Sequence, residues 1–391
     1  MYVFNMMGYE KGTGMNLYRS LLIRFGIACT VYLPLSAGAE IIFREDFDQI
    51  DDFTSTMHTM EKAQSVDKGN IIPEGWYGLY QDTQWSPETG YPTKHASLEI
   101  LKDNADKAYG GQGKSAVHWR ESFSLGWKNW ASDSQLVKVF DQGYKELHIK
   151  FDIRFSPNWW QRENVGNWTS KIFRVGSWSR EGGVFSGFEG ELGPIFLWDY
   201  KRDEYGVRNV YTVRCGPHGS NYNCQNEYSG GSLNYTTHTK GQDVGGEDPA
   251  LENLEGAGYL VDFGGSTTHD QIFGPTEKWT QVEFYVRMNS APGVADGVLR
   301  QWINGERIMN KENVPWVQEN SENKMVQWNY IAIGGNDYFQ PYPNERQFED
   351  WYAIDNLVVR SSMKDNSSDS TTSVPVNGVE PPNPPSNISV K

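Results

Sequence analysis

Two segments of the chain alternate apolar and polar residues over most of their length, and this pattern constrains the fold more than any other feature. The first runs over residues 145–155 and the second over residues 281–289. A period of two puts alternate side chains on opposite faces of an extended strand. One face then packs on a core while the other meets solvent, as in antiparallel sheets. The residues on the apolar side of the first segment are Leu147, Ile149, Phe151, Ile153 and Phe155.

Shorter apolar runs predict further strands, each bounded by Gly, Pro, Asn or Asp. The Asn304-Gly305 pair predicts a two-residue hairpin turn, because both of its central residues need a positive φ. Many short strands with such turns are typical of a sandwich or jelly roll. The sequence therefore predicts an all-β protein of two antiparallel sheets. The further strands are expected at residues 116–122, 171–177, 194–200, 209–215, 297–303, 329–334 and 351–360.

The first 39 residues predict a secretory signal peptide. Arg19 and Arg24 precede an apolar stretch from residue 25 to residue 35, and Ala37-Gly38-Ala39 provides a small-residue cleavage site. Met15 is an alternative start, and a short membrane anchor is an alternative reading that the brevity of the apolar stretch disfavours. We expect a secreted protein, extracellular or periplasmic, that begins at Glu40 and has no membrane contact once the signal is removed.

Composition divides the rest of the chain into a domain and a tail. Residues 40–362 carry the strand pattern, and the Gly-rich segment 216–275 within them is interpreted as a functional loop. Residues 363–391 are rich in Ser, Pro and Asn, which predicts a disordered tail or a linker. The sequence does not indicate whether a further domain follows or what the oligomeric state is.

The net charge and the aromatic content limit the classes of molecule that the protein is expected to bind. The formal net charge is −15, so binding to the phosphates of a nucleic acid would gain nothing from counterion release. The chain holds 15 Trp, 21 Tyr and 18 Phe, residues that build cores and also provide stacking surfaces for sugar rings.

Two cysteines remain after signal removal. Cys215 and Cys224 are an even pair in an exported chain, which favours a disulfide that closes one loop. A zinc site that includes His218 is the alternative, although a fourth ligand is not evident.

Several motifs together resemble the concanavalin A-like jelly rolls of secreted polysaccharide lyases, the group that includes heparin lyase I-like and alginate-lyase-like enzymes. The resemblance implies a concanavalin A-like sandwich and β-elimination on an acidic polysaccharide that contains uronic acid. Non-catalytic carbohydrate-binding or adhesion modules and family 16-type glycoside hydrolases share this fold and remain alternatives. The paired acidic motif of those hydrolases is absent, since the nearest stretch is Glu189-Gly190-Glu191. The resembling motifs are residues 43–47, 113–120, 146–156, 296–305 and 351–359.

The lyase reading selects candidate residues by chemistry. Elimination needs a base, an acid and a group that neutralises the uronate carboxylate. We assign proton transfer to His118 and Tyr211, and the acid groups of the sugar to Arg120, Lys171 and Arg287. Lys171 and Arg174 face opposite sides of a strand unless a bulge intervenes. For each of these residues an ordinary solvated or core role is the alternative. Further candidates for substrate binding are Arg174, Trp178, Trp198, Arg214 and Tyr285.

A structural calcium ion is the one cofactor that the resemblance suggests, and no organic cofactor is expected. In jelly rolls of this type an acidic residue of the opening strand approaches an Asp of the closing strand. Glu45, Asp46 and Asp355 match this arrangement, and carboxylate oxygens suit calcium. Ordinary surface acidity is the alternative interpretation.

Overall fold

The computed structural model describes residues 39–81, 95–120, 133–157, 159, 168–185, 192–203, 206–216, 232–237, 268–319, 324–339 and 350–363. All of these residues belong to the compact unit Gly38–Lys391. The predicted signal segment before residue 39 and the predicted tail after residue 363 lie outside the described residues, so both stay predictions.

One sheet, here sheet A, has the strand order β15-β14-β13-β8-β18-β6-β5-β2, and β1 pairs with β18. Its strand pairs are antiparallel. The strands are β1 (Ile41–Glu45), β2 (Phe53–Thr54), β5 (Leu98–Ile100), β6 (Ala116–Trp119), β8 (Glu146–Phe155), β13 (Thr280–Arg287), β14 (Gly297–Ile303), β15 (Glu306–Val314) and β18 (Trp351–Arg360).

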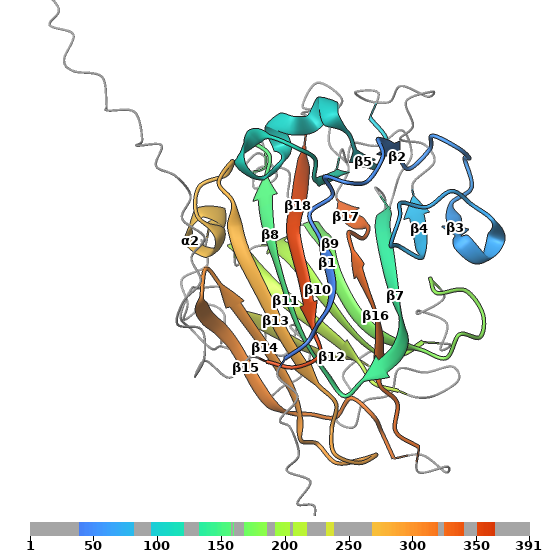
Figure 1. Cartoon of the computed structure of the whole chain (residues 1–391). Helices are drawn as coiled ribbons and strands as arrows, with labels where there is room; N and C mark the ends of the chain where they lie inside the picture. Colours follow the sequence, from blue (N-terminus) through green and yellow to red (C-terminus); the bar gives the residue numbers. More distant parts are fainter. Residues whose placement is uncertain are drawn as a thin grey trace, which may run out of the picture. The chain divides into compact units, whose positions relative to one another are not determined.

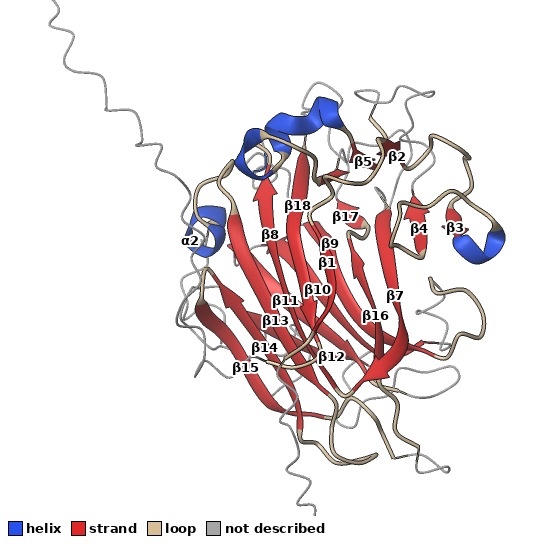
Figure 2. Cartoon of the chain, in the orientation of Figure 1, coloured by secondary structure: helices blue, strands red, loops and turns tan. Residues whose placement is uncertain are grey.

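The second sheet, sheet B, has the order β12-β11-β10-β9-β16-β7-β4-β3, and β17 pairs with β9. It is also antiparallel, and Figures 1 and 2 show its strands behind those of sheet A. The strands are β3 (Ala63–Ser65), β4 (Gly78–Gln81), β7 (Ser134–Tyr144), β9 (Trp168–Trp178), β10 (Leu192–Asp203), β11 (Gly206–Arg214), β12 (Ser232–Thr237), β16 (Trp328–Ile333) and β17 (Asp337–Phe339).

Helical structure within the described residues is limited to short pieces. They are the 3₁₀ turns η1 (Val66–Lys68), η2 (Lys102–Lys107) and η3 (Tyr109–Gly111) and the single-turn helix α2 (His269–Phe273). The prediction of an all-β protein with two antiparallel sheets is confirmed. None of the described helices is long and apolar enough to cross a membrane.

The core lies between the sheets and follows from the alternation of the strands. In β8, buried and half-buried residues alternate over the whole strand, as the sequence predicts. Phe151 of β8 meets Phe173 of β9 and Phe284 of β13, at centroid separations of 5.3 and 6.3 Å. Each such ring contributes roughly 1.5–3 kcal/mol by burial. The predicted hairpin is also present, with φ of 50° at Asn304 and 78° at Gly305.

Candidate functional site

A β-bulge in β9 decides which of its side chains share a face. Ile172 and Phe173 are adjacent in sequence, and both are buried in the core between the sheets. The pairing of β10 with β9 shifts at this point, since Trp198 pairs with Phe173 and Asp199 pairs with Lys171. A residue inserted in one strand reverses the alternation beyond it. Lys171 and Arg174 therefore both lie on the outer face of sheet B.

Four charged side chains gather on this face, and we call them the outer charged cluster: Lys171, Arg174, Asp199 and Arg214. Asp199 is the cross-strand partner of Lys171, and Arg214 is paired with Ile195, which lies on the outer face. Directly opposite residues in antiparallel strands share a face. Lys171 and Asp199 are each 7% exposed and Arg174 is 4% exposed, whereas Arg214 is half-buried. The cluster therefore reaches solvent through β11.

The surroundings of Lys171 shift its protonation. Burial is the main reason that the pKa of Lys171 is lowered to about 8, and Arg174 and Arg214 lower it in opposition to Asp199. Burial also raises the pKa of Asp199, although Lys171 and Arg214 act against that rise. Thr212 Oγ1 donates a hydrogen bond to Asp199 Oδ2 at 3.4 Å. An amine with a pKa near 8 can both accept and release a proton close to neutral pH.

The backbone around Lys171 is held by a close glycine contact. A Cβ added to Gly335, in the connection between β16 and β17, would lie 2.6 Å from the Lys171 Cβ, so only glycine lets this connection approach β9 so closely. The Lys171 amide donates to the Asn336 carbonyl at 3.1 Å. The backbone of β9 at Lys171 is therefore held against the connection between β16 and β17.

An apolar group of side chains lies beside the charged cluster on the same face, and we call it the outer apolar cluster. Trp178, a predicted sugar-binding residue, belongs to it and is 5% exposed, and its indole Nε1 donates to the Glu181 carbonyl at 3.2 Å. The buried members are Val137, Trp178, Val184, Ile195, Leu197, Tyr330 and Ala332, with Tyr77, Val139 and Phe185 packed against them.

His118 and Arg120 are brought together as predicted, but inside the sandwich. Both side chains are fully buried. Arg120 Nε lies 3.3 Å from Asp337 Oδ1 and another guanidinium nitrogen donates to the Tyr352 hydroxyl. His118 Nδ1 lies 2.9 Å from the Ser134 carbonyl, and burial lowers the pKa of His118 well below its usual value. The predicted contact of these two residues with substrate is therefore corrected, because the core covers them.

This interior network lies under the outer charged cluster. The Tyr352 hydroxyl donates to the Lys171 carbonyl at 3.4 Å and its ring stacks on His118 at a centroid separation of 4.9 Å. Arg120 and Tyr352 are thus tied to the strand that carries Lys171. We interpret them as residues that position β9.

Tyr211 and Trp198 also face the core. The Tyr211 hydroxyl donates to Gln301 of sheet A, and Trp198 Nε1 donates to Asn209 Oδ1 at 2.8 Å. Both side chains have no exposed area. Their predicted roles in proton transfer and in sugar binding are corrected, because neither joins the outer charged cluster.

Tyr285 and Arg287 share a face as predicted, but it is the outer face of sheet A. Val286, between them, is buried in the core, so its two neighbours point the other way. The Tyr285 hydroxyl donates to Glu146, and the Arg300 guanidinium lies 5.7 Å from the Tyr285 ring centroid. These residues are therefore on the opposite side of the sandwich from Lys171, which corrects their predicted place in one constellation with it.

The sequence pattern did not identify Asp199 of the outer charged cluster or Thr212, which donates a hydrogen bond to it. In β10, Ile195 and Leu197 face outward while Phe196 and Trp198 face the core, so apolar residues cover both faces. A period of two is invisible in such a run. Thr212 lies between Tyr211 and Val213, which both face the core, so the alternation of β11 could have placed Thr212 on the outer face.

The residues predicted to hold calcium are already engaged by the protein at the end of β1. Glu45 accepts hydrogen bonds from the Phe47 amide at 2.8 Å and the Trp76 indole at 3.1 Å. Asp46 accepts one from the Asp48 amide at 3.2 Å. Within the part of the chain that the structure describes, no group of three or more His, Cys, Asp or Glu side chains is placed to hold a metal.

Asp355 is the most perturbed of the predicted calcium ligands. Burial raises its pKa to about 7, and the nearby Asp48 and Asp152 carboxylates add to the rise. Its oxygens accept hydrogen bonds from the Tyr109 amide at 2.9 Å and the Asn356 amide at 2.7 Å. Calcium binding by Glu45, Asp46 and Asp355 stays a prediction.

Cys215 follows β11 in the core and is disulfide-bonded. Its predicted partner Cys224 lies outside the described residues. The pairing of Cys215 with Cys224 stays a prediction.

No family model matches the chain, and no curated protein matches it. Among solved structures, it is similar to an alginate lyase in complex with an alginate tetrasaccharide, with 13% identity, 82% of this chain and 97% of that chain covered, and a TM-score of 0.41. An endo-β-1,4-glucuronan lyase from the fungus Trichoderma reesei gives 12% identity, coverage of 76% and 93%, and a TM-score of 0.41. A non-specific endo-β-1,3(4)-glucanase of family GH16 has 7% sequence identity and a TM-score of 0.38, with 84% of this chain and 92% of that chain covered. Likenesses this distant do not determine the activity, which must come from the residues.

Proposed function

We propose that this protein is a carbon-oxygen lyase that cleaves a uronic-acid-containing polysaccharide by β-elimination, with the outer charged cluster as its active site. The observation that carries the proposal is Lys171, an amine whose pKa is lowered to about 8, placed with Arg174 and Arg214 on one sheet face. Elimination needs a base that is neutral near working pH and cations that meet a carboxylate. This cluster supplies both.

Each residue then has a defined part in the reaction. Neutral Lys171 removes the proton next to the uronate carboxylate, the electron pair forms the new C=C bond, and the C–O bond to the next sugar breaks. Arg174 and Arg214 pair with the carboxylate as negative charge develops on it. The Lys171 ammonium returns its proton to the leaving oxygen when both lie on one side of the ring. No water, oxidant or cofactor enters the balance.

Asp199 keeps the cations together. Without it, three cationic side chains would repel one another on a nearly buried surface, which costs stability. Its place opposite Lys171 and its hydrogen bond from Thr212 at 3.4 Å orient the carboxylate toward the amine. Asp199 is therefore a positioning residue in this proposal.

A glycoside hydrolase is the second candidate. Hydrolysis needs two carboxyl groups roughly 5–9.5 Å apart, and Asp133 and Asp199 both act on the Lys171 charge. Asp133 is nevertheless ion-paired with Lys62 at 3.2 Å, and Asp199 is opposite Lys171. Because each of these carboxylates has a lysine beside it, the arrangement favours the lyase over the hydrolase. A non-catalytic binding module would not need an amine with a lowered pKa.

The proposal includes export of the mature chain from Glu40 onward and a structural calcium ion. The test is the ultraviolet absorbance of the unsaturated product when this mature protein meets alginate, glucuronan, ulvan, heparin and chondroitin, with and without calcium. Rising absorbance on one polymer supports the lyase. A flat trace with new reducing ends on neutral glucans would replace it with the hydrolase, and retention on a polysaccharide column without new ends would leave a binding module.

A further inference from the structure

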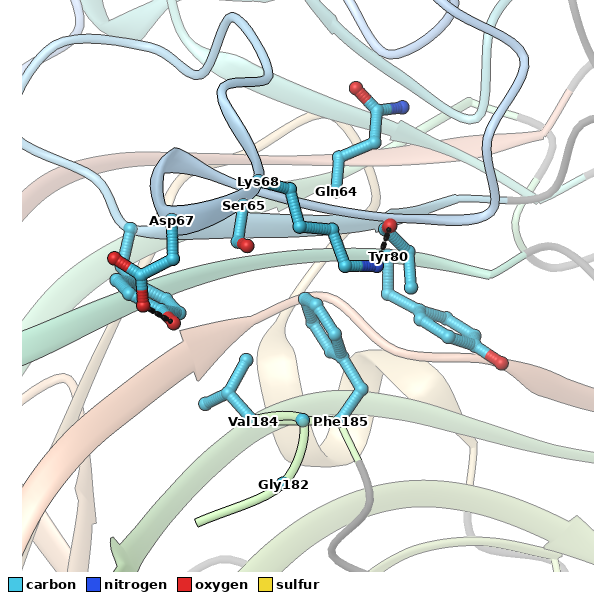
Figure 3. Close-up of a pocket in the computed structure, with 11 residues that line it drawn as sticks. Gln64, Ser65, Asp67, Lys68, Tyr80, Gly182, Val184 and Phe185 are labelled. Carbon is cyan, nitrogen blue, oxygen red and sulfur yellow. Dashed lines mark hydrogen bonds between the residues drawn. The ribbon is translucent and has the colours of Figure 1, made fainter. Parts of the chain in front are cut away.

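A second feature of sheet B lies at the edge formed by β3 and β4, away from the outer charged cluster. It is a pocket of about 540 Å³ between these strands, the turn η1 and the segment 182–185 (Figure 3). Its walls include Lys68, Tyr80 and Phe185. No step of the proposed reaction uses this pocket.

One wall of the pocket is aromatic. The rings of Tyr80 and Phe185 lie 5.0 Å apart at their centroids, tilted by 41°, and both are only half-buried. Phe185 is close to Gly78, where an added Cβ would meet the ring at 3.5 Å and the Gln64 carbonyl at 2.9 Å. Half-exposed rings in a concave site offer apolar faces on which a sugar ring can stack.

The other wall is polar. Lys68 Nζ donates to the Ala63 carbonyl at 2.9 Å, and an ammonium has three donors, so two are left for a ligand. The Tyr77 hydroxyl donates to Asp67 at 2.6 Å, and burial is the main reason that the pKa of Tyr77 is raised to about 12. Tyr77 therefore remains a neutral group on this wall.

We propose that this pocket is a second binding site for the acidic polysaccharide, with one uronate residue stacked on Tyr80 and Phe185 and its carboxylate on Lys68. The ligand class rests on the proposed function. Two half-exposed aromatic rings beside an ammonium match a sugar ring that carries a carboxylate. The pocket lining also holds Asp67, but its carboxylate accepts the Tyr77 hydrogen bond, whereas the Lys68 ammonium keeps donors for the carboxylate of an anionic sugar.

The position of the pocket sets the length of ligand that benefits. Leu79, next to Tyr80 in β4, is buried in the core between the sheets, so the Tyr80 ring lies on the outer face of sheet B, like Lys171. The sheet order puts β4 three strand positions from β9, which is roughly 14 Å at the usual spacing. One polymer molecule can contact both sites, whereas a disaccharide cannot. Two linked contacts raise the affinity for long chains without changing that for short ones.

The experiment measures binding of a polyuronate and of its disaccharide by calorimetry, in a Lys171→Met background that prevents cleavage. Adding Lys68→Gln or Phe185→Ala should weaken polymer binding about tenfold or more, as expected for loss of a charged hydrogen bond or of a stacked ring, and should leave disaccharide binding at the outer charged cluster unchanged. Lys68 is exposed, so its substitution does not endanger folding. Lys278→Gln, at another exposed lysine, is the matched control and should have no effect.

The outcomes separate this proposal from the proposed function. Unchanged polymer binding in both pocket variants, while the wild type still cleaves the polymer, overturns the pocket alone. Polymer binding that depends on Lys68 without any unsaturated product from the wild type supports the pocket and overturns the lyase. No binding of any acidic polymer overturns both.

Discussion

The two sheets both present charged side chains on their outer faces, but the surroundings of these charges differ. On sheet A, His148 Nε2 lies 3.0 Å from Glu283 Oε2, and Arg300 donates to Glu312 at 2.6 Å. These side chains are partly or largely exposed. On sheet B, Lys171 is nearly buried and lies with two guanidiniums.

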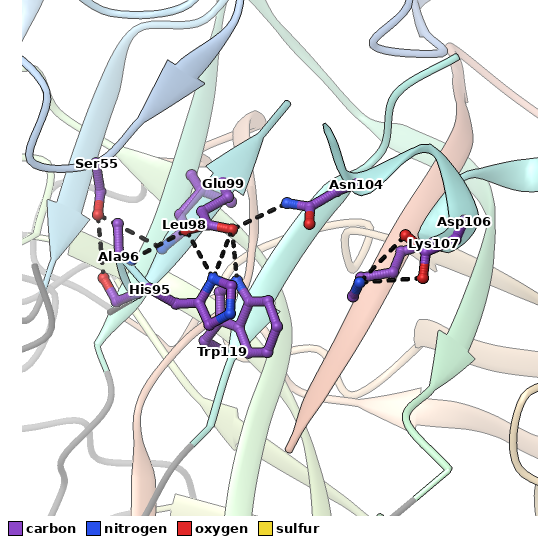
Figure 4. Close-up of polar contacts among 10 residues, drawn as sticks. Ser55, His95, Ala96, Leu98, Glu99, Asn104, Asp106, Lys107 and Trp119 are labelled. Atoms are coloured by element: carbon purple, nitrogen blue, oxygen red, sulfur yellow. Dashed lines mark hydrogen bonds and ion pairs between the residues drawn. The ribbon is translucent and has the colours of Figure 1, made fainter. Parts of the chain in front are cut away.

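Sheet A also shows what a purely structural polar network looks like (Figure 4). Glu99 accepts hydrogen bonds from Trp119 Nε1 and Asn104 Nδ2, each at 2.9 Å, and the His95 ring stacks on Trp119. Burial raises the pKa of Glu99, but its hydrogen bonds outweigh this effect, so the pKa is lowered overall. The Glu99 carboxylate is thus stabilised in its ionised form, and it holds η2 on the sheet through Asn104. Lys171, with a pKa near neutral pH, can be charged or neutral and is suited to proton transfer.

The largest expected effect on stability comes from beneath sheet B. Asp337→Asn removes the carboxylate that lies 3.3 Å from the fully buried Arg120 guanidinium, and we expect the free energy of unfolding to fall by about 3–5 kcal/mol. Urea denaturation measures it, with Asp51→Asn, at an exposed carboxylate, as control. A loss no larger than that of the control would contradict the account of the interior network.

The next effect compares arginines of the two outer faces. Arg174→Gln removes a cation from the proposed carboxylate site, so kcat/KM on the best polyuronate should fall about tenfold to a hundredfold. Arg287→Gln, on sheet A, should leave it nearly unchanged. An equal fall in kcat/KM in both variants would contradict the assignment of the active site to the outer face of sheet B.

The pH dependence sharpens the same comparison. Because the base must be neutral and its pKa is about 8, the rate should rise about tenfold per pH unit below that value and level off above it. Arg174 lowers the pKa of Lys171, so Arg174→Gln should move the profile to higher pH. A rate that is independent of pH below 8 would exclude Lys171 as the base.

Asp355, at the other side of the molecule, gives the smallest expected effect. Its pKa rises from 3.8 to about 7 on folding, so its contribution to stability is fully present below 3.8 and is lost as pH rises through 7. Asp355→Asn mimics the protonated form and should raise the melting temperature by a few degrees at pH 8, without a gain at pH 3. A gain at both pH values would contradict this.

Calcium would reverse the sign of that result. If Asp355 binds the ion, calcium should raise the melting temperature of the wild type, and Asp355→Asn should abolish this response. No response of the wild type to calcium would remove the ion from the proposal.

The strands were predictable where the alternation is clean. Strands β14 and β18 begin and end where the sequence predicts, and β8 within one residue. Strand β7 was missed, because buried residues occupy the four consecutive positions from Ser134 to Val137. In such a stretch both faces are covered, so no period of two is visible.

The site was only partly predictable from the sequence. Periodicity shows which residues of a strand share a face, but it does not show to which sheet the strand belongs or whether that face points to the core. Lys171, Arg174 and Arg214 were named from their chemistry, and the bulge that unites the first two is a pairing feature of β10 with β9. His118 and Tyr211 look identical to outward residues in the sequence, yet they point inward. Only the pairing of the strands, which fixes the face that each side chain occupies, distinguishes these cases.

The most direct test of the account compares two lysines, one from each outer face. Lys171→Met and Lys150→Met each remove an amine, and Lys150 belongs to sheet A, where it lies 3.9 Å from Glu283. The measurement is the initial rate of unsaturated product from the best polyuronate. We predict a loss of about 10²–10⁴-fold for Lys171→Met, typical of a removed general base, and nearly full activity for Lys150→Met. Full activity of Lys171→Met would contradict the assignment of the active site to the outer face of sheet B.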